Sequence, residues 1–347
     1  MIRIQQSAKE GRLRTALFAA RRTRRANMTC NHRREAEKRR MPAVRLWIAV
    51  LAGGHGRRLQ AFVRDVLGED RPKQFCRFIG HRSMLRHTWD RALGLVPANR
   101  VVTAITAGQE DFVAAEASHG IPGRVLVQPA NRETGPGLLL PLLWIARRDP
   151  EAMVAVFPAD HFIWEESRFL AHVAEAVGTG RRYAERIVLL GMEPEGPETS
   201  YGWIEPGLLL ESTPLHREVY TVARFWEKPD LDRARALQQQ GCLWNSFVMA
   251  GAAHAFLQLA QVHVPELVAT VQEASRWFDT AAEREAFAAV YRRLRPVNFS
   301  REILEPGQDA LMVQVARGIT WSDWGEPDRV LQTIRQFDRR PTWLAAH

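Results

Sequence analysis

The chain has 347 residues, of which 46% are hydrophobic and 25% charged, as in ordinary soluble globular proteins with one large α/β domain or two small ones. No apolar stretch reaches the ~18 to 20 residues of a membrane span. The three cysteines are scattered and lack CxxC spacing, which argues against disulfides and cysteine zinc sites and favours the cytoplasm. The net charge of +9 raises nucleic-acid binding as a possibility, which depends on where the charge lies.

The basic charge is concentrated at the start of the chain. Residues 1–41 carry thirteen lysines and arginines against three glutamates, whereas 42–347 carry 35 basic and 36 acidic residues. The tail has three interpretations: a targeting segment, a nucleic-acid-binding arm, or translation from an upstream start codon. Met28 and Met41 offer later starts, so we favour the third and expect a disordered tail. Because the remainder carries no excess of positive charge, we do not expect nucleic acid as a partner.

From residue 45 onward, short apolar runs alternate with longer helical patterns. Predicted strands occupy 46–51, 100–106, 124–127, 152–157 and 186–191. Predicted helices occupy 82–95, 109–118, 134–148, 166–181, 230–240, 253–263 and 281–294. This alternation predicts an α/β, Rossmann-like fold, with a mostly parallel sheet and helices on both of its faces.

The pattern becomes richer in strands after about residue 200. Further strands are predicted at 201–205, 219–226, 243–249 and 311–316. We interpret this part as an insertion that closes over one edge of the sheet. The absence of a Pro/Gly/Ser-rich linker makes 42–347 one continuous domain in this prediction.

Three glycines follow the first predicted strand, in "WIAVLAGGHGRRLQ" (47–60). Gly53, Gly54 and Gly56 let backbone N–H groups approach an anion, and the guanidinium groups of Arg57 and Arg58 suit phosphate. The spacing is neither GxGxxG nor GxxxxGK[ST], so neither a dinucleotide site nor a P-loop is indicated. The alternative to a phosphate site is an ordinary glycine-rich turn that binds no ligand.

A second polar motif, "PADH", follows the predicted strand 152–157. Ligands of open α/β sheets bind beyond the carboxyl ends of the strands. Asp160 and the glycine loop should therefore lie on the same rim of the sheet. Taken alone, Asp160 could equally be a helix N-cap, and His161 a hydrogen-bonded spacer.

The motifs together resemble one family. "LAGGHGRRL" is similar to the LAGGxGTRL signature of sugar-1-phosphate nucleotidyltransferases, and "RPKQF" (71–75) resembles the YPKQF of their mannose-1-phosphate guanylyltransferase branch. The resemblance continues in chain order through "ANRETGPGLLL", "FPADHFI", "PETSYGWIE", "FWEKPD", "WNSF" and "TWSDWGEPDRV". It covers almost everything after residue 45.

The resemblance implies attack of a sugar-1-phosphate oxygen on the α-phosphate of a nucleoside triphosphate, with release of pyrophosphate. The attacking phosphate is already deprotonated at neutral pH, so the site needs fixed positive charge and a hard metal ion rather than a general base. By resemblance, Arg58 grips the triphosphate, Lys73 stabilises the transferring phosphoryl group, and Asp160 holds Mg²⁺.

The same resemblance implies two groups of binding residues. The nucleotide side comprises Leu51, Ala52, Gly53, Gly54, Gly56, Arg57, Asn131 and Arg132. The sugar-phosphate side comprises Gly202, Glu227, Lys228 and Asn245. These sides correspond to parts at about 42–195 and 196–325. Ordinary turn chemistry for Asn131 and Arg132, and a solvated strand end for Glu227 and Lys228, remain alternatives.

The sequence departs from the family pattern at several positions. Arg57 replaces the usual loop threonine, "NRETGPG" replaces RNTAPA, and the segment between Arg64 and Pro72 is longer by about four residues. Ser300 stands where the family places an aspartate at a second metal position. Asp323 is then the best remaining carboxylate to complete the metal site, and Glu302 is an outside candidate.

The leading prediction is a Mg²⁺-dependent transferase that makes GDP-mannose from GTP and mannose-1-phosphate for surface polysaccharide. Another nucleoside triphosphate or hexose phosphate is the nearest alternative. The other alternative is a catalytically degenerate family member that binds a nucleotide sugar and acts as a regulator; Ser300 in place of the aspartate motivates it. A homodimer is expected only because it is common among soluble enzymes of this size.

Overall fold

A computed structural model describes residues 45–337, apart from 118–119 and 213–217, together with residue 341. By its contacts the chain divides into two units, Met1–Val44 and Arg45–His347. The prediction of a disordered basic tail at 1–41 lies outside the described residues. Every helix in the described part is too short or too polar to cross a lipid bilayer.

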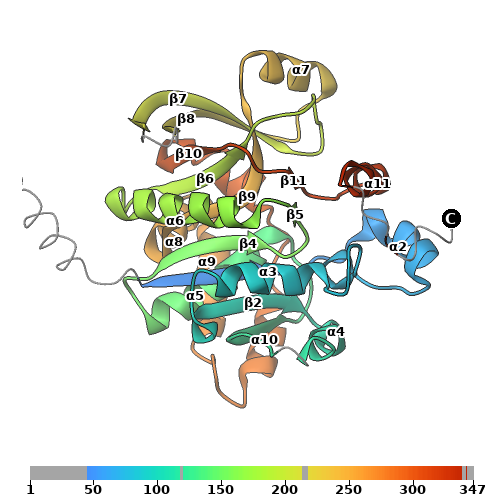
Figure 1. Cartoon of the computed structure of the whole chain (residues 1–347). Helices are drawn as coiled ribbons and strands as arrows, with labels where there is room; N and C mark the ends of the chain where they lie inside the picture. Colours follow the sequence, from blue (N-terminus) through green and yellow to red (C-terminus); the bar gives the residue numbers. More distant parts are fainter. Residues whose placement is uncertain (1–44, 118–119, 213–217, 338–340, 342–347) are drawn as a thin grey trace, which may run out of the picture. The chain divides into compact units, whose positions relative to one another are not determined.

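A nine-stranded sheet with the order β3-β2-β1-β4-β9-β6-β10-β8-β7 forms the centre of the second unit (Figure 1). Its strands are β1 (Leu46–Leu51), β2 (Val101–Thr106), β3 (Arg124–Gln128), β4 (Met153–Pro158), β6 (Ile187–Met192), β7 (Gly202–Ser212), β8 (Glu218–Glu227), β9 (Leu243–Ala252) and β10 (Leu311–Ala316). The pairings place β8 and β9 antiparallel to their neighbours, while the other seven strands run in one direction. The sheet is therefore mostly parallel, as predicted.

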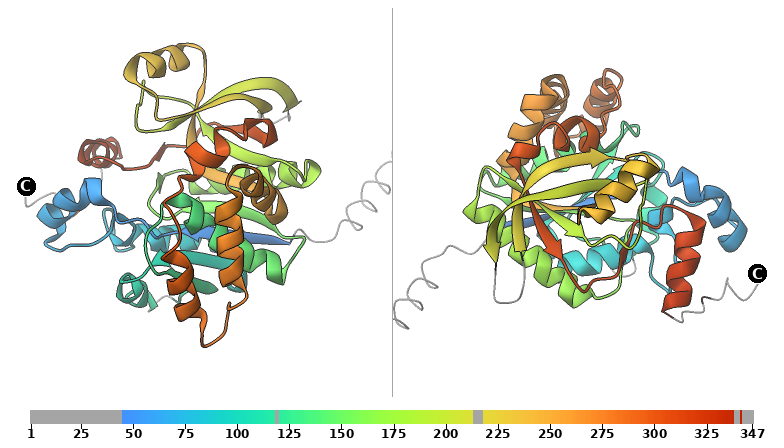
Figure 2. Two further views of the ribbon diagram at one scale, coloured as in Figure 1. Left: turned by 180° about the vertical axis from the view of Figure 1, so that it is seen from behind. Right: turned by 90° about the horizontal axis from the view of Figure 1, so that it is seen from above.

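Helices cover both faces of this sheet (Figures 1 and 2). One face carries α3 (Met84–Leu93) and α6 (Glu166–Arg182). The other carries α5 (Thr134–Arg148), α8 (Ala253–His263), α9 (Pro265–Ser275) and α10 (Glu283–Tyr291). Helix α5 is buried continuously from Gly135 to Ile145, because its sequence is apolar all round and it packs between the sheet and the other helices.

The predicted α/β fold class is confirmed, and most element boundaries agree within one or two residues. Two predicted elements differ clearly: the strand at 201–205 extends to Ser212, and the helix at 109–118 is only α4 (Glu110–Ala114). The later strands also do not form an insertion over one edge. Strand β9 lies inside the sheet between β4 and β6, so the two halves of the chain share one core.

A second, smaller apolar cluster joins elements that the sequence did not predict. It contains residues of α2 (Gln60–Leu67), α11 (Pro327–Gln336), β5 (Phe162–Ile163) and the segment after β11 (Trp321–Ser322). Trp324 stacks on Phe162 with ring centroids 4.8 Å apart, and Phe78 meets Trp324 edge-on at 5.4 Å. The cluster fixes the segments that carry the "PADH" and "WSDWG" motifs.

Candidate active site

The glycine loop after β1 is held by side-chain amides that bind its carbonyl oxygens. Gln74 Nε2 donates to the oxygens of Ala52 (2.6 Å) and Gly54 (2.8 Å), and Gln109 Nε2 donates to Gly54 at 3.0 Å. Thr106 Oγ1 donates to the Gly53 oxygen at 2.9 Å. Because the carbonyls are bound to the protein, they do not face an incoming anion.

The N–H groups of the same loop are left available. Within the described part of the chain, the amides of Gly53, Gly54, His55 and Gly56 have no hydrogen-bond acceptor. The 3₁₀ turn Arg57–Leu59 begins directly after Gly56. A row of unpaired backbone amides beside Arg58 is chemically suited to phosphate.

Gly56 requires glycine, and Gly53 leaves little room for a side chain. A Cβ on Gly53 would lie 2.8 Å from Gln128 Nε2, and a Cβ on Gly56 would lie 3.0 Å from the Lys73 backbone nitrogen. Gly56 also has φ +61°, a backbone conformation that residues with a side chain rarely adopt. The loop therefore lies directly against the segment that carries Lys73.

Lys73 and Asp160 form an ion pair at the carboxyl ends of the central strands. Lys73 Nζ lies 2.8 Å from Asp160 Oδ2 and also donates to the backbone oxygen of Asp323. The Lys73 side chain is 6% exposed and that of Asp160 38% exposed. Burial has the largest single effect and raises the pKa of Asp160, but the Lys73 ammonium, His161 and hydrogen bonds together lower this pKa below its usual value, so the carboxyl remains ionised.

His161 is neutral in this arrangement. Burial lowers the pKa of His161 to about 4. The indole N–H of Trp321 donates to His161 Nδ1 at 3.2 Å, so the ring proton belongs on Nε2, which lies 3.7 Å from Asp160 Oδ1. The expectation of a hydrogen-bonded spacer agrees with this geometry.

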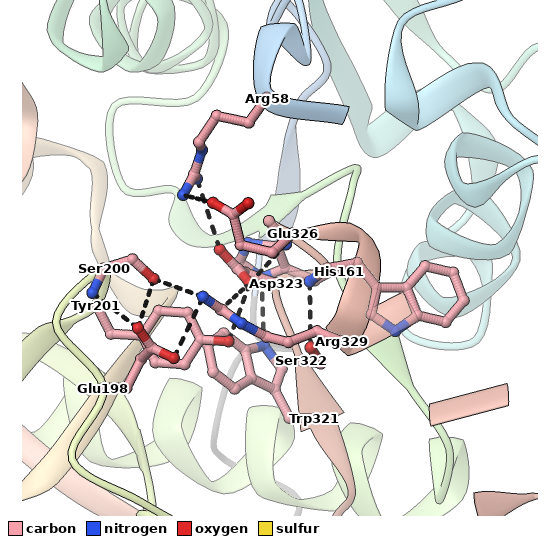
Figure 3. A network of polar contacts seen from close by, with 12 residues as sticks. Arg58, His161, Glu198, Ser200, Tyr201, Trp321, Ser322, Asp323, Glu326 and Arg329 are labelled. Carbon is pink, nitrogen blue, oxygen red and sulfur yellow. Dashed lines mark hydrogen bonds and ion pairs between the residues drawn. The ribbon is translucent and has the colours of Figure 1, made fainter. Parts of the chain in front are cut away.

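A short strand pair brings Asp323 to the same place. Strands β5 and β11 pair antiparallel, with Ile163 opposite Trp321 and Phe162 opposite Ser322. Asp323 Oδ1 accepts hydrogen bonds from Tyr201 OH (2.9 Å), the Gly325 backbone N–H (2.8 Å) and Arg329 Nη1 (2.7 Å) (Figure 3).

The two aspartates differ as candidate Mg²⁺ ligands. Mg²⁺ prefers one or two carboxylates, with phosphate oxygens and water completing an octahedron. The partly exposed, ionised Asp160 fits such a site. Asp323 Oδ1 is taken by three donors, and the described residues contain no cluster of three or more His, Cys, Asp or Glu side chains able to hold a metal. The site therefore fits an ion held largely by substrate oxygens.

The predicted sugar-side residues converge on one point. In the β7–β8 pair, Gly202 lies opposite Glu227, and a Cβ on Gly202 would be 3.1 Å from Glu227 Oε2 and 3.2 Å from Asn245 Cβ. Lys228 Nζ lies 3.8 Å from Glu227 Oε1. Burial raises the pKa of Glu227, although Lys228 and Arg301 oppose this.

One cavity of about 400 Å³ joins the two groups. The predicted residues that line it are Leu51, Ala52, Gly53, Gly54, Arg58, Lys73, Asn131, Asp160, Gly202, Glu227, Lys228, Asn245, Ser300 and Asp323. Gly56 and Arg57 instead line an adjoining cavity of about 540 Å³, which shares Arg58, Lys73 and Asp160 with the first. Together the two cavities form a continuous lined surface from the glycine loop to Glu227.

Two candidate residues lie outside both cavities. Arg132 donates through Nε to the backbone oxygen of Tyr291 at 3.4 Å. Glu302 pairs with Arg295 at 2.6 Å and accepts from the Asn298 N–H. Arg132 and Glu302 are therefore bound to other parts of the protein, and neither side chain faces the two cavities.

Sequence reasoning missed several cavity residues. Gln128 lines the cavity and accepts from Tyr291 OH at 3.2 Å, which directs its amide N–H₂ group away from Tyr291. Glu133 and Phe247 were also missed; both line the cavity and, like the predicted Lys228, have φ between +55° and +68°. Such strain in non-glycine residues is typical of functional sites, but motif reading does not reveal it.

Comparisons with known proteins identify the family of the chain. The family model described as nucleotidyl transferase matches residues 48–339. The chain is 30% identical over 297 residues to the xanthan biosynthesis protein XanB of Xanthomonas campestris, covering 83% of this chain and 59% of that protein. It is 31% identical over 298 residues to a mannose-1-phosphate guanylyltransferase of Escherichia coli K12, covering 82% and 59%. The chain thus spans about 59% of the length of these relatives.

Solved structures show the same fold. A crystal structure described as mannose-1-phosphate geranyltransferase from Thermus thermophilus matches with a TM-score of 0.69 and 26% identity, covering 83% of this chain and 79% of that one. A putative glucose-1-phosphate thymidylyltransferase from Bacillus anthracis matches in fold with a TM-score of 0.53 and 13% identity, covering 86% and 98%. Since the family model spans most of the chain, the chain belongs to the nucleotidyl transferase family.

Proposed function

We propose that this chain transfers a nucleotidyl group from a nucleoside triphosphate to a hexose-1-phosphate in the cytoplasm and releases pyrophosphate. One observation carries the proposal: the unpaired amides of the glycine loop and the Lys73–Asp160 pair share a cavity with Gly202 and Glu227. An anion cradle and a group of sugar-binding polar side chains in one cavity suit a reaction between two phosphate esters.

In this proposal the two ends of the cavity have different roles. The amides of Gly53 to Gly56 and the Arg58 guanidinium bind the triphosphate. Glu227 accepts hydrogen bonds from sugar hydroxyls, and Lys228 faces the sugar phosphate. Gly202 leaves room because any side chain there would contact Glu227 and Asn245.

The chemical step is a direct displacement at the α-phosphorus. An oxygen of the sugar phosphate forms the new P–O bond, the bond to the β-phosphate oxygen breaks, and pyrophosphate leaves with its electron pair. No proton transfer is needed in this step. The Lys73 ammonium, fixed by Asp160 and the Asp323 carbonyl, stabilises the charge that develops on the phosphoryl oxygens. A bound Mg²⁺ would supply further neutralisation there, with Asp160 as its protein ligand.

Within this reaction class, we propose GTP and mannose-1-phosphate as substrates. The relatives named mannose-1-phosphate guanylyltransferase support this choice. The Gln128 side chain, aligned by Tyr291 at the cavity wall, offers an amide donor to a base-edge carbonyl such as that of guanine.

Purified protein incubated with each nucleoside triphosphate, each hexose-1-phosphate and Mg²⁺ tests the proposal by pyrophosphate release and by chromatography of the nucleotide sugar. We expect the GTP and mannose-1-phosphate pair to give the highest kcat/KM. Turnover of another pair would correct the substrates. Binding of a nucleotide sugar without any turnover would contradict the catalytic proposal and favour a regulator.

The raised pKa of Glu227 predicts a pH dependence at the sugar end. As the pH falls through that pKa, which lies above the usual 4.5, the carboxylate gains a proton and loses an acceptor for the sugar hydroxyls. We expect KM for mannose-1-phosphate to rise on the acid side, measured relative to Glu227→Gln at each pH. The ratio of the wild-type KM to the Glu227→Gln KM is compared across the pH range, so that the titration of the substrate itself cancels. A ratio that does not change with pH would contradict the role of Glu227.

Glu326 competes for the guanidinium that should bind the triphosphate. Arg58 Nη1 donates to Glu326 Oε1 at 3.3 Å, and both side chains are about half exposed. Exposed pairs contribute about 0.2–1 kcal/mol, so Glu326→Gln is expected to lower KM for GTP by up to about fivefold. Steady-state kinetics checks this, with Glu302→Gln as the control outside the cavity. An increase in KM would show that Glu326 assists binding.

A further inference from the structure

Arg329 lies on α11 and has four partners around the cavity; it stands in the motif "TWSDWGEPDRV", but the resemblance assigned it no role. Nη1 lies 2.7 Å from Asp323 Oδ1, and Nη2 lies 2.8 Å from Ser200 Oγ and 3.2 Å from Glu198 Oε2 (Figure 3). The guanidinium also lies over the Tyr201 ring, 4.8 Å from its centroid. It therefore joins the turn after β11 to the segment before β7.

The position of Arg329 on its helix is itself informative. It is the third residue of α11, in the first turn, where the helix dipole disfavours a cation. Its contacts with Asp323 and Glu198 compensate for that placement. A cation held there indicates a specific electrostatic task rather than support of the helix.

Asp323 lies between two arginines that differ in burial and distance. Arg329 makes the short, well-buried pair, with side-chain exposures of 19% for Arg329 and 15% for Asp323. Arg58 Nη2 lies 3.9 Å from Asp323 Oδ2, and the Arg58 side chain is 53% exposed. Arg58 is thus close enough to take over the carboxylate if Arg329 were absent, and exposed enough to move there.

We propose that Arg329 is a positioning residue that takes up the charge of Asp323 and so leaves Arg58 available for the triphosphate. This inference depends on the proposed function only in assigning a nucleoside triphosphate to Arg58. Without Arg329, the mostly buried Asp323 carboxylate would attract Arg58 and would also present uncompensated negative charge toward the incoming phosphates. Arg329 would then govern triphosphate affinity without touching the nucleotide.

A double-mutant cycle on GTP binding tests this role. The four proteins are the wild type, Arg329→Met, Asp323→Asn and the double variant, and calorimetry gives the Kd of GTP for each, so no turnover is required. We expect Arg329→Met to weaken GTP binding about tenfold when Asp323 is present and less than about twofold in the Asp323→Asn background. A purely structural role for Arg329 predicts equal weakening in both backgrounds, and that result would overturn the proposal.

Two controls separate this result from other failures. Arg329→Lys retains the charge and should recover most of the affinity, while Arg335→Met removes an exposed arginine from the same helix and should change nothing. If Arg329→Met does not fold, Arg329→Lys and Arg329→Gln are compared in the same cycle. Absence of GTP binding by the wild type would contradict the proposed function itself, whereas normal binding by Arg329→Met would overturn only this inference.

Discussion

Lys73→Ala is expected to lower kcat of nucleotidyl transfer about 10³-fold, the effect typical of removing a fixed cation from a phosphoryl-transfer site. The Lys73 side chain is almost fully buried, and the contacts of its Nζ with Asp160 Oδ2 and the Asp323 carbonyl fix its position. Under the proposed function, its charge would act on the transferring phosphoryl group without reorganisation. Steady-state kinetics with GTP and mannose-1-phosphate measures the loss.

The control for this variant is Arg64→Ala, which removes a cation from an exposed pair with Asp70 outside the cavity. Arg64→Ala should keep the wild-type rate. Thermal unfolding of Lys73→Ala is measured in parallel, because Asp160 then loses its buried partner. A folded Lys73→Ala protein with near-normal kcat would remove Lys73 from the chemical step.

Asp160→Asn is expected to lower kcat about 10²- to 10³-fold and to weaken the dependence of the rate on Mg²⁺. The substitution keeps the size of the side chain but removes the charge that the Lys73 ammonium stabilises. The measurement is the rate as a function of Mg²⁺ concentration, with chelator at zero metal. The wild type should be inactive in chelator.

Asp70→Asn, the partner of Arg64 on the surface, is the matched control and should follow the wild-type Mg²⁺ curve. An Asp160→Asn protein with an unchanged Mg²⁺ curve would show that the metal ligands lie elsewhere. The geometry would then require a different account of Asp323, whose Oδ1 is bound by Arg329 and Tyr201.

The sequence predicted those features that local patterns encode. Runs such as 46–51 and 311–316 are continuously apolar because their strands are buried on both faces, so their boundaries were predicted to the residue. The glycine loop and Asp160 were predicted on one rim, because both follow parallel strands. The described structure places both in the same cavity.

The features that the sequence did not reveal depend on contacts between distant segments. The two-residue strands β5 and β11 are too short to show periodicity, yet their pairing across about 160 residues brings Asp323 beside Asp160. Arg329 gains its role only through Asp323 and Ser200, which no spacing rule connects. Arg132, by contrast, matched a motif but binds the Tyr291 carbonyl.

The most direct test of the central claim is a crystal structure with bound GDP-mannose. The account predicts the two phosphates between the amides of Gly53 to Gly56 and Lys73 Nζ, with the hexose against Gly202 and Glu227. A nucleotide sugar seated elsewhere, for example in the separate cavity lined by Phe78 and Trp164, would contradict it.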